Sequence, residues 1–124
     1  MEFAAITGLI ISVLQTLSAD KRITEEQRQA TRIALSAAFH ATEGYYASLS
    51  AGDTKDKLQE HEIARLWDEV AIRMEPFDPS VANRLGLKSR YWREGAAWSD
   101  EKIAGAKIQL NSIRQHARFA LIRK

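Results

Sequence analysis

The chain of 124 residues has the length of one domain, and its composition, 45% hydrophobic and 27% charged, is that of an ordinary globular protein. The absence of cysteine excludes disulfide bonds, thiolate zinc sites, iron–sulfur clusters and cysteine nucleophiles. Two prolines and six glycines are too few for a disordered or fibrous chain. We therefore expect a single domain over residues 1–124.

The first predicted helix covers residues 2–17 and is apolar on nearly every side. A helix of this kind must be covered over most of its surface, and three other helices of a chain this short leave part of it uncovered. We therefore expect an interface with a second copy of the chain, most simply in a two-fold dimer. The expected interface residues recur every three or four positions: Phe3, Ile6, Ile10, Val13 and Leu17.

The same apolar run raises the question of a membrane or export segment. From Phe3 to Leu14 it is shorter than the roughly 20 residues that span a bilayer. No positively charged segment precedes it, as a signal peptide would require. We expect no membrane partner and a cytoplasmic location.

The second predicted helix begins at Thr24, an N-cap residue with Gln27 as its capping-box partner, and runs to about Leu49. Gly52 suits the C-terminal cap of this helix. One stripe of side chains is expected in the core: Leu35, Phe39, Thr42, Tyr46 and Leu49.

The third predicted helix has Asp53 or Thr54 as its N-cap. Its polar side offers two weak ion pairs, of Arg65 with Glu62 and of Arg65 with Glu69. Its apolar side is expected in the core: Leu58, Ile63, Leu66, Trp67, Val70, Ala71 and Met74.

The remaining elements are a short helix and a long one. The short helix is expected over residues 79–85, with Asp78 as its N-cap and Gly86 at its end. Residues 88–98 follow no regular pattern, and the last long helix is expected over residues 99–122. No run alternates as a strand does. The fold class is therefore all-α, an antiparallel four-helix bundle with a short extra helix before the last long helix.

The net charge of +2 conceals a strong asymmetry along the chain. Residues 1–83 carry 8 Lys/Arg and 13 Asp/Glu, a balance of −5, whereas residues 84–124 carry 10 and 3, a balance of +7. The basic side chains either pair with the acidic third helix and complement helix dipoles, or form an anion-binding face together with nearby aromatic rings. The residues of that candidate face are Arg84, Lys88, Arg90, Trp92, Arg93, Lys107, Arg114 and Arg118.

No catalytic motif or metal-ligand spacing is found among the three histidines, and no cofactor is predicted. Arg32, Ser36 and His40 share one face of the second predicted helix, most simply as a solvated polar stripe. Our leading hypothesis is a small non-catalytic interaction or accessory protein that self-associates through its first helix, with a further protein partner left open. The alternative is a nucleic-acid-binding module that uses residues 84–124, and a nuclease-like bundle comes third.

Overall fold

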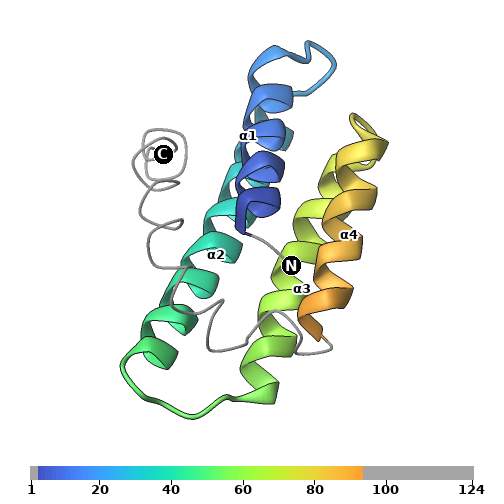
Figure 1. Ribbon diagram of the computed structural model, residues 1–124. Helices are drawn as coiled ribbons and strands as arrows, with labels where there is room; N and C mark the ends of the chain where they lie inside the picture. The colour runs from blue at the N-terminus through green and yellow to red at the C-terminus, as the bar shows by residue number, and fades with distance from the viewer. Residues whose placement is uncertain (1–2, 94–124) are drawn as a thin grey trace.

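The computed structural model describes residues 3–93, with the backbone alone at positions 3–7, 88, 91 and 92. These residues form four helices and no strand (Figure 1), which confirms the all-α class. The last long helix, expected over residues 99–122, lies outside the described residues. The four helices are α1 (Phe3–Ala19), α2 (Glu25–Ser50), α3 (Lys57–Met74) and α4 (Pro79–Arg93).

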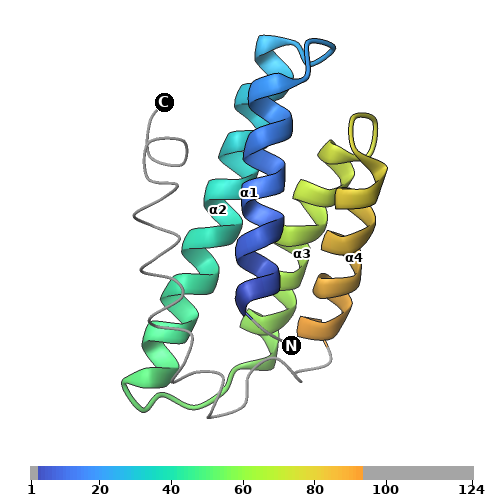
Figure 2. The ribbon, with the colours of Figure 1, turned by 45° about the horizontal axis from the view of Figure 1, so that its top comes forward.

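The helices pack lengthwise around one core. α3 contacts both α2 and α4, and α1 contacts α4. The loop between α1 and α2 and the loop between α3 and α4 lie at one end of the molecule, and the loop between α2 and α3 lies at the opposite end (Figures 1 and 2). All four helices contribute fully buried side chains, the largest of which are Trp67, Tyr45, Tyr46, Phe39, Ile10, Leu17, Leu35, Ile63, Met74 and Leu85.

The ends of α2 follow the local signals in the sequence. Thr24 accepts a hydrogen bond from the Gln27 backbone N–H at 3.1 Å, and the Gln27 side chain accepts one from the Thr24 N–H at 2.9 Å. This is the predicted capping box. At the other end Gly52 has a φ of 99°, and its N–H donates to the Leu49 carbonyl at 3.1 Å. Ala51 is the C-cap residue, and Gly52 directly after it adopts this left-handed conformation without steric cost, which confirms that Gly52 belongs to the C-terminal capping motif.

The start of α3 differs from the prediction. Asp56 is the N-cap, rather than Asp53 or Thr54, and its carboxylate accepts from the Leu58 N–H at 3.0 Å. The Asp56 N–H itself donates to the Tyr45 hydroxyl at 2.9 Å, so a contact with α2 fixes the cap at this residue. In consequence Leu58 lies in the first turn and is 81% exposed, and its prediction as a core residue is wrong.

α4 is longer than the short helix predicted over residues 79–85. Asp78 caps it as expected, accepting from the Val81 N–H at 3.2 Å. Gly86 does not end it, and the helix continues through the segment predicted to be irregular as far as Arg93. The reason is packing on α3, because buried Ser89 donates to the Ala64 carbonyl at 2.9 Å. Such tertiary contacts outweigh the roughly 1 kcal/mol that an internal glycine costs a helix.

The predicted core positions of α2 and α3 are otherwise largely correct. Trp67 is 1% exposed, and its indole N–H donates to the Thr42 hydroxyl at 2.9 Å. That hydroxyl donates in turn to the Ala38 carbonyl at 2.8 Å, so the buried polar atoms of this contact are satisfied. No helix within residues 3–93 is long and apolar enough to cross a membrane.

Candidate functional site

α1 has one buried face and one exposed face, and neither carries a charge, because no Asp, Glu, Lys or Arg occurs between Phe3 and Ala19. The exposed face includes Ile11, which is 42% exposed. The buried face consists of Leu9, Ile10, Val13 and Leu17. The exposed face consists of Gly8, Ile11, Gln15, Ser18 and Ala19.

The structure places the predicted interface residues of α1 in two groups. Ile10, Val13 and Leu17 are at most 1% exposed and pack in the core of the chain itself. Phe3 and Ile6 lie in the part of α1 where only the backbone is described. The buried face of α1 is already covered by the chain itself, so a partner can contact only the exposed face, which includes Ile11.

The basic residues of α4 do not form one face. Arg84 and Arg90 are both exposed, and neither forms an ion pair with any residue in the described range 3–93. They are six residues apart, which separates them by about 120° around the helix. The backbone alone is described at Lys88 and Trp92. The remaining candidates, Lys107, Arg114 and Arg118, lie outside the described residues.

Arg93 is placed differently from Arg84 and Arg90. Its guanidinium donates to the Asp68 carboxylate of α3 at 2.7 Å, which ties the C-terminal end of α4 to α3. The acidic third helix thus neutralises this residue of the candidate basic face. On the surface of α3 the predicted Glu62–Arg65 pair is present at 2.6 Å. Glu69 pairs with Arg73 at 2.9 Å rather than with Arg65, because a glutamate four residues before an arginine is the favoured orientation.

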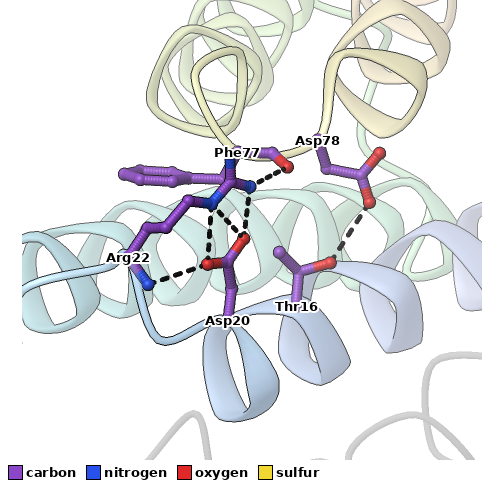
Figure 3. A network of polar contacts seen from close by, with 5 residues as sticks. All are labelled: Thr16, Asp20, Arg22, Phe77 and Asp78. Carbon is purple, nitrogen blue, oxygen red and sulfur yellow. Dashed lines mark hydrogen bonds and ion pairs between the residues drawn. The ribbon is translucent and has the colours of Figure 1, made fainter.

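A polar cluster joins the two loops at one end of the molecule (Figure 3). Arg22 donates to both carboxylate oxygens of Asp20, with its nearest nitrogen at 2.5 Å, and to the Phe77 carbonyl at 3.0 Å. The Arg22 guanidinium also lies 5.8 Å from the centre of the Phe77 ring. Beside it the Thr16 hydroxyl donates to Asp78 at 3.2 Å. We call these five residues the loop clasp.

The loop clasp changes the acidity of Asp20. Hydrogen bonds from the side chain and the backbone of Arg22 lower the pKa of Asp20 from 3.8 to about 2. The carboxylate therefore stays charged over the whole physiological range. Within residues 3–93 its partners all belong to the chain itself, so the clasp is a structural connection between loops.

A second polar cluster is buried between α2 and the start of α3. The Tyr45 hydroxyl donates to the Glu60 carboxylate at 2.7 Å and accepts from the Asp56 N–H at 2.9 Å. Tyr45 and Glu60 are 1% and 4% exposed. Burial, together with hydrogen bonding to Glu60, raises the pKa of Tyr45 to about 12. The hydroxyl therefore remains protonated and continues to donate its hydrogen bond to the buried Glu60 carboxylate.

The polar stripe of α2, formed by Arg32, Ser36 and His40, is the third group of polar side chains that could take part in binding or chemistry. Ser36 Oγ and the Nδ1 atom of His40 are 3.2 Å apart, and His40 is exposed. Arg32 lies one turn before Ser36, and its Nε atom is buried without a hydrogen-bond partner in the described part of the chain. Such an unpaired buried donor costs about 1–3 kcal/mol in general.

Neither polar cluster was predicted from the sequence. Asp20 and Arg22 are two residues apart in a turn, and Tyr45 and Glu60 lie on different helices, so neither pair has a periodic signal. The one usable hint is that a tyrosine on an apolar stripe needs a hydrogen-bond partner when it is buried. Within residues 3–93 no group of three or more acidic or histidine side chains is arranged to hold a metal ion. Comparisons with protein-family models, with curated proteins and with solved structures found no match for this chain.

Proposed function

We propose that the protein is a small non-catalytic interaction protein that self-associates through the exposed face of α1. One observation carries the proposal: α1 is the one helix of the four described that contains no charged residue, and it still exposes Ile11. Charged side chains are depleted from the centres of protein interfaces, whereas solvated helices normally carry them. A second copy is the simplest partner, because a two-fold axis sets the same uncharged face against itself.

We further propose how the rest of the chain completes the fold. The chain is one domain over residues 1–124, and the helix expected over residues 99–122 completes an antiparallel bundle. The amphipathic pattern of that segment supports this, because the apolar side of such a helix must be buried against another apolar surface. The protein then acts in the cytoplasm as an interaction or accessory protein.

The test is the mass in solution. Light scattering coupled to gel filtration is expected to return twice the 14.0 kDa of one chain. Ile11→Glu is expected to return the monomer, because the two-fold axis places two new charges in one interface. Gln15→Lys, on the same exposed face, should also shift the equilibrium toward the monomer. The matched control is Ile72→Glu on α3, where an isoleucine that is 68% exposed lies outside the proposed interface.

Two results would count against this function. One is a native protein that remains a monomer at the highest concentration reached. The other is an Ile72→Glu variant that dissociates as fully as Ile11→Glu, because general loss of apolar surface would then explain both. Circular dichroism of each variant separates dissociation from unfolding.

The alternative function is nucleic-acid binding. It is supported by the exposed Arg84 and Arg90, which have no carboxylate partner within residues 3–93. A mobility-shift assay with a random duplex and a single strand tests it, and binding must weaken steeply with added salt if phosphates are contacted. Arg84→Gln with Arg90→Gln should then reduce the salt dependence.

A further inference from the structure

The arginines of the described helices and loops divide by whether they have a carboxylate partner. Five of them form ion pairs: Arg22, Arg28, Arg65, Arg73 and Arg93. Arg32 forms none with a described residue, and it differs from the exposed Arg84 and Arg90 because its Nε atom is buried without a hydrogen-bond partner there. Arg32 as a whole is half-buried, so part of its side chain can still be reached from outside, and a guanidinium with one unsatisfied nitrogen and no carboxylate partner within residues 3–93 favours an external acceptor.

The next two turns of α2 place further donors beside Arg32. Ser36 is four residues on and half-buried, and its Oγ lies 3.2 Å from Nδ1 of His40. When the imidazole carries its proton on Nδ1, it donates to Ser36 Oγ, and the serine hydroxyl is then free to donate elsewhere. Arg32, Ser36 and His40 lie at i, i+4 and i+8, so they follow one another along the same side of the helix.

Within residues 3–93 no carboxylate forms an ion pair with Arg32. Glu25 is one of the acids of the first turn and pairs with Arg28 at 3.4 Å. Glu43, one turn beyond His40, has an interaction of its own. No ion pair connects either acid to Arg32.

We propose that Arg32 and Ser36 bind a phosphate-type oxyanion on α2, with His40 as the positioning residue that turns the Ser36 hydroxyl toward it. A guanidinium presents a planar fork that matches two oxygens of a phosphate group, and a hydroxyl supplies a donor to a third. The ligand is either inorganic phosphate or the phosphate of a small monoester. This site is independent of the self-association through α1.

The experiment is a titration of the full-length, isotope-labelled protein with sodium phosphate, followed by nuclear magnetic resonance, against sodium chloride at equal ionic strength. Phosphate should shift the Arg32 Nε–H resonance saturably, and the His40 ring nitrogens should move toward the form protonated on Nδ1. The Arg84 Nε–H resonance should show only the shift that chloride produces. A second arm with a nucleoside monophosphate distinguishes the sources, because tighter binding indicates a monoester and equal binding indicates free phosphate.

Variants then assign the residues. Arg32→Gln should weaken phosphate binding at least tenfold, the effect of removing a charge-assisted hydrogen bond. Ser36→Ala should weaken it severalfold, and His40→Gln should weaken it and abolish the ring-nitrogen signature. The matched control Arg84→Gln should change affinity less than twofold.

The proposal is overturned if the folded native protein shows no saturable shift at Arg32. It is equally overturned if Arg84→Gln weakens binding as much as Arg32→Gln, since the effect would then be general charge. If Arg32→Gln does not fold, the native titration and Ser36→Ala still decide the question.

Discussion

The hydroxyl group of Tyr45 offers the sharpest test of how the helices are held together. Tyr45→Phe removes one oxygen and keeps the ring, so packing in the core is preserved and only the polar contacts are lost. The Glu60 carboxylate, 4% exposed, loses the donor that lies at 2.7 Å, and the Asp56 N–H loses its acceptor at 2.9 Å.

The two losses differ in size. A hydrogen bond to a charged group contributes about 1.5–3 kcal/mol. Asp56 is exposed at the start of α3, so water can replace the Tyr45 oxygen at its N–H at small cost. We therefore expect Tyr45→Phe to lower the free energy of unfolding by about 2–4 kcal/mol, most of it through Glu60.

Urea denaturation followed by circular dichroism measures this change, and a double-mutant cycle apportions it. Tyr45→Phe and Glu60→Gln, alone and combined, should show a coupling of about 1–3 kcal/mol. The control Glu62→Gln combined with Tyr45→Phe should show none, since Glu62 is exposed and pairs with Arg65. A loss below about 1 kcal/mol in Tyr45→Phe would refute the reasoning, because the buried carboxylate would then have no need of this donor.

Four further predictions concern pH and local structure. The pKa of Tyr45 is raised to about 12, above the value of about 10 for an unfolded chain. The contribution of this shift to the free energy of unfolding is therefore complete below pH 10 and is lost as pH rises toward 12. Tyr45→Phe should flatten that part of a stability–pH curve. The pKa of Asp20 is lowered to about 2, so its contribution is complete above about pH 4 and is lost as pH falls toward 2; a carboxyl resonance that titrates near 4 would contradict the loop clasp. Gly52→Ala should destabilise the protein by about 1–2 kcal/mol because residue 52 has a φ of 99°. Gly86→Ala should stabilise it by up to about 1 kcal/mol, because Gly86 lies inside α4 with nothing within 4 Å of the new carbon. Melting temperatures that moved in the same direction in both variants would contradict the different backbone conformations of the two glycines. Leu58→Ala should change stability by less than about 0.5 kcal/mol and Ile63→Ala, fully buried, by about 2–5 kcal/mol in the same urea assay, and equal effects would mean that α3 is turned differently.

The sequence predicts the ends of helices where a local signal determines them. Thr24 with Gln27, and Asp78 with Pro79, act within one turn, so no knowledge of the rest of the chain is needed to place them. The start of α3 and the end of α4 could not be placed in this way. The N-cap position of Asp56 is stabilised by its hydrogen bond to the Tyr45 hydroxyl. The helix continues past Gly86 because of contacts such as that of Ser89 with Ala64. Both contacts join residues far apart in the chain.

The same limit applies to the candidate site. An apolar residue such as Val13 satisfies the requirements of a core and of an interface equally well, so a sequence pattern alone cannot separate the two. The exposed face of α1 is recognised only when the structure shows which side the core already uses. Likewise the charge count finds the basic α4, but only the helix geometry shows that Arg84 and Arg90 lie on different sides and that Arg93 pairs with Asp68.

The loop clasp has a consequence for the order of folding. The bond from Arg22 to Phe77 spans 55 residues, and the segment it closes contains the whole of α2 and α3. Bringing together ends so far apart costs more chain entropy than joining α2 to α3 across their short loop. We expect the α2–α3 hairpin to form early and the clasp to close late, so that α1 is the last helix to dock and the first to detach.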